Sequence, residues 1–114
     1  MTNNKNSTRY YSTRQEKAIA KAINGRQTAN SGATMFGAGD VITDLWLIEA
    51  KTKTSECKSF AIKKDWLEKN KNEAFALRKR YNALCFDFGD NKQRYYVIDE
   101  RTFKVFNAML EKEN

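Results

Sequence analysis

Glu49 and Lys51, separated by a single residue, are the side chains in this sequence that best fit catalytic chemistry. They lie in residues 45–51, where apolar and β-branched side chains are enriched as in a strand. Residues two apart in a strand point to the same side, so these two side chains are neighbours on one face. Asp40 in the preceding segment joins them there if a tight turn near residues 43–44 connects the two strands.

The turn sets the distance between the two carboxylates. If it centres on residues 43–44, Asp40 faces Leu47 and is the diagonal neighbour of Glu49, roughly 7–8 Å away between backbones. Two carboxylates placed in this way can hold one cation between them. Asp44 is the alternative, but it lies an odd number of residues from Glu49 and would face elsewhere if it were still in the strand. Asp40 is therefore the preferred residue.

This group of residue types fits hydrolysis of a phosphodiester. Mg²⁺ prefers oxygen ligands and keeps several waters, so two carboxylates and a backbone carbonyl suffice to hold it. The metal polarises a phosphoryl oxygen and lowers the pKa of a bound water. A neighbouring lysine can orient that water or stabilise the charge of the transition state. The alternative is an ordinary amphipathic strand whose Glu49 and Lys51 lie on a solvated face.

The sequence contains no histidine, which excludes several enzyme classes. Ser-His-Asp and Cys-His hydrolases and histidine-based zinc sites all need an imidazole. Any catalysis must therefore use carboxylates, lysines or hydroxyl groups. Cys57 and Cys85 stand alone without metal-binding spacing, and we expect them to be small apolar core residues.

Length and charge bound the remaining possibilities. A chain of 114 residues predicts one domain, here residues 12–114, behind a flexible basic arm over residues 1–11. No apolar run approaches the roughly 20 residues of a membrane span, and the polar N-terminus lacks a signal sequence, so we expect a cytoplasmic protein. The net charge of +7 favours a polyanionic partner, with nucleic acid ahead of an anionic membrane surface.

Periodicity predicts an α/β protein with a central mixed sheet flanked by helices. The last helix begins after Asp99 and is expected to turn Phe103, Phe106 and Leu110 inward. The other expected elements are a helix at 13–24, a first hairpin within 34–52, a short strand near 58–60, a long helix within 59–81 with a possible break at 70–72, and a second hairpin of 83–88 and 94–98.

Four sequence features together resemble the PD-(D/E)XK nuclease superfamily, and within it the archaeal and phage Holliday junction resolvase branch. They are S-G-A from Ser31 to Ala33, G-D-V from Gly39 to Val41, I-E-A-K from Ile48 to Lys51, and a preceding helix with an early Glu16. Gly39 stands where the family name has proline, and the spacing of nine residues from Asp40 to Glu49 implies a tight hairpin.

The resemblance implies a restriction-endonuclease-like αβββαβ core and metal-dependent cleavage of DNA. Glu16, Asp40 and Glu49 would bind Mg²⁺ together with the Ala50 carbonyl, Mn²⁺ could substitute, and Lys51 would assist catalysis. Glu16 has a second interpretation as a helix cap. The candidate DNA contacts are Arg9, Arg14, Ser31, Lys53, Lys63 and Lys64. Ser31 has an alternative interpretation as a turn residue, and Lys63 and Lys64 have one as part of a solvated helix face.

A resolvase-like enzyme would act on branched DNA as a homodimer, because a twofold dimer presents two sites to the two symmetric strands of a junction. Two alternatives stay open. One is a general phage-type restriction-like or repair nuclease. The other is a non-catalytic nucleic-acid-binding module of the same fold.

Overall fold

The computed structural model describes residues 8–28, 40–52, 55–89 and 92–113, with side chains described from Thr13 onward. Three helices separate two groups of consecutive strands in the described residues. The elements are α1 (Thr8–Ile23), β1 (Arg26–Gln27), β2 (Asp40–Ile42), β3 (Trp46–Lys51), α2 (Lys64–Ala76), β4 (Tyr81–Asp87), β5 (Arg94–Val97) and α3 (Glu100–Lys112).

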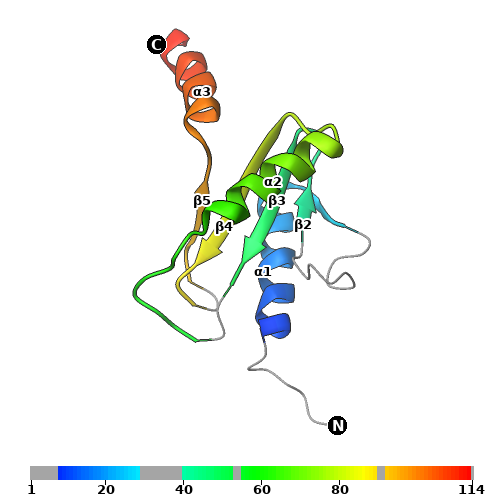
Figure 1. The fold of residues 1–114 in the computed structure, drawn as a ribbon, viewed down its shortest axis with the longest axis vertical. Coiled ribbons are helices and arrows are strands. Elements are labelled where there is room, and N and C mark those ends of the chain that lie inside the picture. Colours follow the sequence, from blue (N-terminus) through cyan, green and yellow to red (C-terminus); the bar gives the residue numbers. More distant parts are fainter. Residues whose placement is uncertain (1–7, 29–39, 53–54, 90–91, 114) are drawn as a thin grey trace.

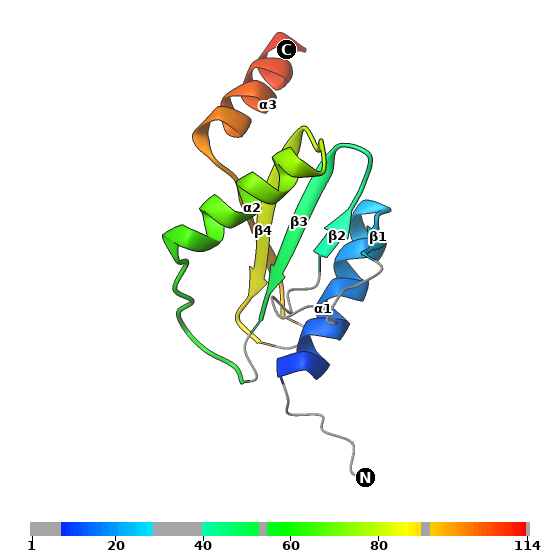
Figure 2. The ribbon, with the colours of Figure 1, turned by 45° about the vertical axis from the view of Figure 1, so that its right-hand side comes forward.

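The strands form one five-stranded sheet in the order β1-β2-β3-β4-β5. β3 and β4 are parallel and joined through α2, whereas the other neighbouring pairs are antiparallel. α1 and α2 lie on opposite sides of the sheet (Figures 1 and 2). The predicted α/β class, with a mixed sheet flanked by helices, is confirmed. The finer assignment to a restriction-endonuclease-like core stays a prediction.

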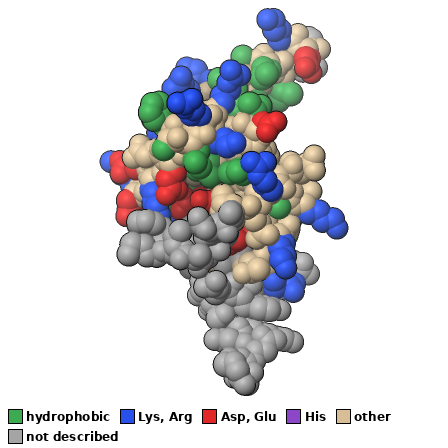
Figure 3. Space-filling model, turned by 90° about the vertical axis from the view of Figure 1, so that its right-hand side faces the viewer, with side chains coloured by type: hydrophobic (Ala, Val, Ile, Leu, Met, Phe, Trp, Pro, Cys, Tyr) green, Lys and Arg blue, Asp and Glu red, His purple; other side chains and the backbone are tan. Residues whose placement is uncertain are grey.

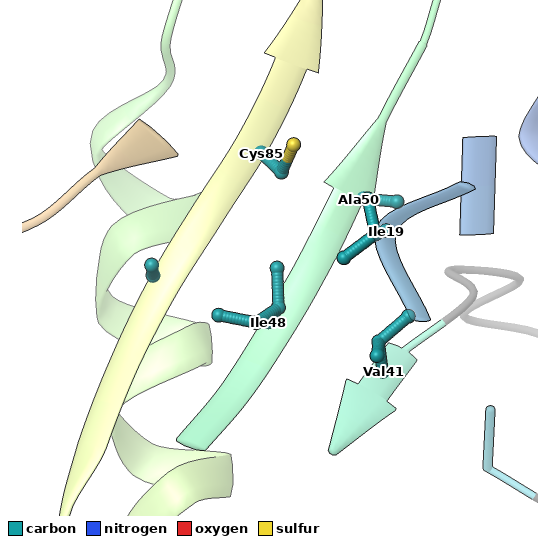
Figure 4. Packing of buried hydrophobic residues seen from close by; sticks show 6 residues of the cluster. Ile19, Val41, Ile48, Ala50 and Cys85 are labelled. Atoms are coloured by element: carbon teal, nitrogen blue, oxygen red, sulfur yellow. The ribbon is translucent and has the colours of Figure 1, made fainter. Parts of the chain in front are cut away.

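The side of the sheet that faces α1 is apolar. Strand alternation places Val41, Ile48, Ala50 and Cys85 there, and Ile19 of α1 packs against them (Figure 4). Burying a side chain of the size of Val or Ile stabilises the fold by about 1.5–3 kcal/mol, so this layer supplies much of the driving force for folding. The prediction that Cys85 is a core residue is confirmed, and its burial raises the pKa of the thiol to about 11.

α1 begins at Thr8, so the predicted flexible arm over residues 1–11 is wrong from residue 8 onward. Residues 1–7 lie outside the described part of the chain. The helix expected at residues 13–24 therefore starts earlier, and Ser12 and Thr13 lie inside it, where serine and threonine cost only a few tenths of a kcal/mol.

Two further expectations about the middle of the chain are wrong. Residues 58–60 form no strand, because Phe60 packs its ring on Trp66 and Phe86 while β1 supplies the third strand before α2. α2 starts at Lys64 and is unbroken at residues 70–72. Asn70 is buried there, and its side-chain oxygen accepts a hydrogen bond from Asn82 Nδ2 at 2.7 Å, a tertiary contact that outweighs the low helix propensity of asparagine.

The second hairpin and the cap of α3 are confirmed. β4 pairs with β5, and the Asp99 carboxylate accepts a hydrogen bond from Thr102 N at 2.8 Å, which lowers the pKa of Asp99. α3 projects beyond the end of the sheet (Figures 1 and 2). Phe106 packs on Trp46 and Tyr81, but Phe103 and Leu110 are exposed, so the inward orientation predicted for those two is wrong.

Among the described helices, none combines the length and the apolar character that crossing a membrane requires.

Candidate active site

The hairpin of β2 and β3 places Asp40 directly opposite Glu49. Its turn lies one residue later than expected, since Thr43 N donates to Trp46 O at 3.1 Å. The Thr43 hydroxyl also accepts from Leu45 N and Trp46 N, at 3.2 and 3.0 Å, and fixes this turn. The pairing therefore differs by two residues from the expected one. An even shift keeps both carboxylates on the same face and brings them closer together than the diagonal arrangement.

Three carboxylates meet on the side of the sheet that faces α2. Single oxygens of Asp40, Glu49 and Glu73 lie within 4.8 Å of one another, with the third carboxylate supplied by α2. Glu49 is completely buried, and the other two are half-buried. On the face shown in Figure 3, most of the acidic side chains in view gather in one area, whereas lysines and arginines are spread widely.

Asp40 and Glu49 have buried oxygens for which the described residues provide no hydrogen-bond donor. Asp40 Oδ1 and both oxygens of Glu49 are buried and accept no hydrogen bond from any residue that the structure describes. Lys51 Nζ approaches Glu49 Oε2 at 3.2 Å as an ion pair, without the alignment of a hydrogen bond. Buried carboxylate oxygens without donors are costly unless a cation binds them, so this group fits a hard divalent metal ion.

The ionisation of Asp40 reflects the crowding of negative charge. Burial raises the pKa of its carboxyl group, the charges of Glu49 and Glu73 raise it further, and it reaches about 7. Lys69 opposes this shift only in part. Binding of a cation would remove the cause of the shift, because it compensates the charge that burial and like-charge repulsion make unfavourable.

Lys51 is held in place through both its side chain and its backbone. Its ammonium lies 3.2 Å from Glu49 and 4.4 Å from the centre of the Trp66 ring, and its side chain is 19% exposed. Its backbone carbonyl accepts a hydrogen bond from Gln15 Nε2 at 2.8 Å, and the same amide donates to Asp87. The buried place of Gln15 in the middle of α1 makes it a tie between α1 and the end of β3.

Glu16 lies near this group but outside it. It is buried two turns inside α1, so the alternative of a helix cap is wrong. Its Oε1 accepts a hydrogen bond from Gln27 Nε2 at 3.1 Å, and its charge makes a small contribution to the raised pKa of Asp40. Glu73 supplies the third carboxylate in its place.

Sequence reasoning missed Glu73, although α2 carried a signal for it. Asn70 and Ala74 are the buried positions of this helix, and Glu73 lies between them along the turn that faces the sheet. A charged residue beside a buried helical stripe can thus be distinguished from one on the solvated face. Asp44, the alternative to Asp40, is exposed in the turn at the far end of the hairpin from Glu49.

The remaining candidates are only partly located. Lys63 and Lys64 are exposed at the start of α2, with Lys63 Nζ 5.6 Å from the centre of the Trp66 ring. Arg14 is exposed on α1, and Arg9 belongs to the first turn of that helix. Ala50 has no partner among the described residues of β2, whose pairing with β3 begins at Glu49. A metal contact of the Ala50 backbone carbonyl stays a prediction. Two candidates, Ser31 and Lys53, lie outside the described residues.

No family model, curated protein or solved structure matches this chain. The chemistry of the site therefore follows from its own geometry. That geometry combines three crowded carboxylates with a lysine ammonium on a chain whose net charge is +7.

Proposed function

We propose that this protein is a metal-dependent endodeoxyribonuclease that hydrolyses phosphodiester bonds with Mg²⁺, for which Mn²⁺ can substitute. The observation that carries the proposal is the meeting of Asp40, Glu49 and Glu73 within 4.8 Å, beside the Lys51 ammonium. Oxygen ligands of this kind are those that Mg²⁺ takes in proteins. A structural ion pair would need only one carboxylate for the lysine, and it would not leave the other carboxylate oxygens buried without donors.

The residues of the site would have different roles in the reaction. Asp40, Glu49 and Glu73 would hold the metal, which when bound supplies Lewis acidity and a more acidic water. The Lys51 ammonium is fixed by Glu49 and Trp66 and stabilises the negative charge that grows on the phosphoryl oxygens. Gln15 holds the carbonyl of the same lysine, so the end of β3 is positioned before a substrate arrives.

DNA is the proposed substrate. The net charge of +7 and the exposed Lys63 and Lys64 at the start of α2 suit a phosphate backbone. The resemblance to Holliday junction resolvases adds branched DNA and a homodimer to the proposal, with a general restriction-like or repair nuclease as the alternative within the enzymes. A non-catalytic binding module is less favoured, because such a module would not require buried carboxylate oxygens that accept no hydrogen bond from the described residues.

Asp40→Asn tests the metal site, because it keeps size and hydrogen bonding but removes charge. We expect cleavage of four-way, flapped and duplex DNA with Mg²⁺ to fall by at least about 100-fold. Binding measured with Ca²⁺ should persist. Asp44→Asn is the matched control, since Asp44 is exposed at the far end of the same hairpin, and it should cut as fast as the wild type. Equal rates for wild type and Asp40→Asn would place the metal site elsewhere.

Lys51→Ala tests the lysine in the same assay. We expect a loss of turnover of similar size with little change in binding, because the transition state carries more charge than the bound substrate. Lys112→Ala, which removes an exposed ammonium in the last turn of α3, should leave the rate of cutting within a few-fold of wild type. A wild-type protein that cuts no DNA with Mg²⁺ or Mn²⁺ would favour the binding module.

A further inference from the structure

An aromatic cluster begins beside Lys51 and ends at the solvent. Its members are Phe60, Trp66, Phe86, Phe88 and Tyr95. The ring of Phe86 lies at its centre, with centroids 4.9 Å from Phe60, 5.5 Å from Phe88 and 5.7 Å from Tyr95. Trp66 joins through Phe60 at 6.5 Å. The cluster lies on the same face of the sheet as the three carboxylates.

Strand pairing aligns this cluster with the candidate active site. Lys51 pairs with Phe86 across β3 and β4, and Phe86 pairs with Tyr95 across β4 and β5. The three residues thus form one row across three neighbouring strands. Two strand spacings separate its ends, roughly 10 Å. Asp40 and Glu49 belong to the adjacent row on that face, two residues further back along β3.

The aromatic cluster differs from an ordinary apolar core in what surrounds its first and last rings. At the inner end, Lys51 Nζ lies 4.4 Å and Lys63 Nζ 5.6 Å from the centre of the Trp66 ring. At the outer end, Tyr95 keeps 44% of its surface exposed although Phe86 and Phe88 support its ring from below. The core on the α1 side contains aliphatic side chains and a cysteine, without such a ring among its buried members. Tyr95 is thus an exposed ring, supported by other rings and two strand spacings from the Lys51 position, and aromatic rings combined with basic side chains bind unpaired nucleotides.

We propose that Tyr95 stacks against an unpaired base of the DNA strand whose phosphate lies at the Asp40–Glu49–Glu73 group, with Lys63 contacting the backbone between them. This inference rests on the proposed function and names its substrate class. Bases within a duplex already stack on one another and cannot cover the tyrosine ring. The protein therefore selects DNA with an unpaired strand next to the bond that is cut.

The adjacent tyrosines provide a matched test. Tyr95 and Tyr96 have nearly equal exposure, 44% and 41%, but Tyr96 pairs with Cys85 and points to the opposite face of the sheet. Tyr95→Leu keeps an apolar side chain against Phe86 and removes the flat ring, whereas Tyr95→Phe keeps the ring. Tyr96→Leu makes the same change on the other face. Circular dichroism of each variant confirms its fold before binding is compared.

Binding is measured by fluorescence anisotropy with a labelled single-stranded oligonucleotide and with its duplex, at low salt with Ca²⁺. For Tyr95→Leu we expect single-strand affinity to fall about 10-fold or more and duplex affinity to change less than about 2-fold, given what one stacked base contributes. Tyr95→Phe and Tyr96→Leu should bind both DNAs as the wild type does. Equal losses for Tyr95→Leu and Tyr96→Leu, or a loss on both DNAs, would overturn the stacking.

The outcome separates this inference from the proposed function, because the assay needs no cleavage. A wild-type protein that cuts DNA with Mg²⁺ but whose Tyr95→Leu variant binds single strands normally overturns the stacking and keeps the nuclease. A protein that never cuts, yet loses single-strand affinity only through Tyr95→Leu, overturns the nuclease and keeps the stacking.

Discussion

The two faces of the sheet are made by the same strands but have opposite character. On the side of α1, Val41 and Ile48 pack against Ile19 in an apolar layer. On the side of α2, the adjacent residues Asp40 and Glu49 place two carboxylates, of which that of Glu49 is completely buried and that of Asp40 half-buried. Successive side chains alternate between the faces, so a change of one residue moves a position from one role to the other.

This comparison teaches that stability and chemistry can be separated within one hairpin. The α1 side contributes buried apolar area, which favours folding directly. The carboxylates on the α2 side work against folding, because buried carboxylate oxygens without donors are costly. The apolar side therefore has to offset the cost of the charged side. Substitutions on the two faces should consequently change different observables.

Ile48→Ala and Glu49→Gln should show the largest difference between the two faces of the sheet. Ile48→Ala removes buried methyl groups and should lower the free energy of unfolding by about 2–5 kcal/mol, measured by urea titration. Glu49→Gln loses a largely buried ion pair with Lys51, but it also removes the cost of burying a charge and the repulsion with Asp40, so these effects should largely cancel and stability should change less than in Ile48→Ala. The rate of DNA cleavage by the folded variants should show the reverse order, with a larger loss in Glu49→Gln than in Ile48→Ala. A large loss of stability in Glu49→Gln would show that the carboxylate is structural.

The pH dependence of stability should carry the signature of Asp40. Its pKa is about 7 in the folded protein, above its ordinary value of 3.8, so the folded state holds the extra proton between these values. The resulting stability is fully present below about pH 4 and is lost as the pH rises through 7. With chelator present, the thermal midpoint of the wild type should therefore fall relative to that of Asp40→Asn between pH 5 and pH 8.

Asp44→Asn serves as the control for this pH series, because Asp44 is exposed in the turn. Its thermal midpoint should follow the wild type at every pH. Parallel curves for wild type and Asp40→Asn would mean that Asp40 is ionised throughout this range.

The smallest expected effect concerns Asn70, the buried polar residue of α2. Asn70→Ala removes the hydrogen bond with Asn82 and should cost about 1 kcal/mol more than Asn72→Ala, an exposed change in the same helix. Both substitutions bring the same gain in helix propensity, so the difference isolates the buried contact. Chemical denaturation of the two variants measures it, and equal stabilities would assign no net value to the hydrogen bond.

Local alternation explains which parts of the site could be predicted from sequence. Asp40, Glu49 and Lys51 were assigned to one face, and this holds although the turn lies one residue later, because the pairing shifted by an even number. Glu73 could not be assigned in the same way. Its position depends on how α2 packs across β3 and β4, which no local pattern specifies.

The fold shows the same division. The apolar alternation of residues 46–51 and the cap at Asp99 predicted β3 and the start of α3. The apolar spacing of Phe103, Phe106 and Leu110 indicated an amphipathic helix. It could not indicate that α3 extends past the sheet, so that of these three side chains Phe106 alone packs on the ring of Trp46. Periodicity identifies an apolar face, whereas tertiary arrangement decides what covers it.

The crossover through α2 also sets the order in which the site can assemble during folding. The hairpin joins Asp40 and Glu49 over nine residues, a loop that closes at little entropic cost. β3 meets β4 only when residues 35 apart in the chain, such as Trp46 and Tyr81, come together. α2 carries Glu73 over the hairpin in that later step. The repulsion between Glu73 and the two strand carboxylates is thus absent while the hairpin forms and arises only with the long-range contacts that can outweigh it.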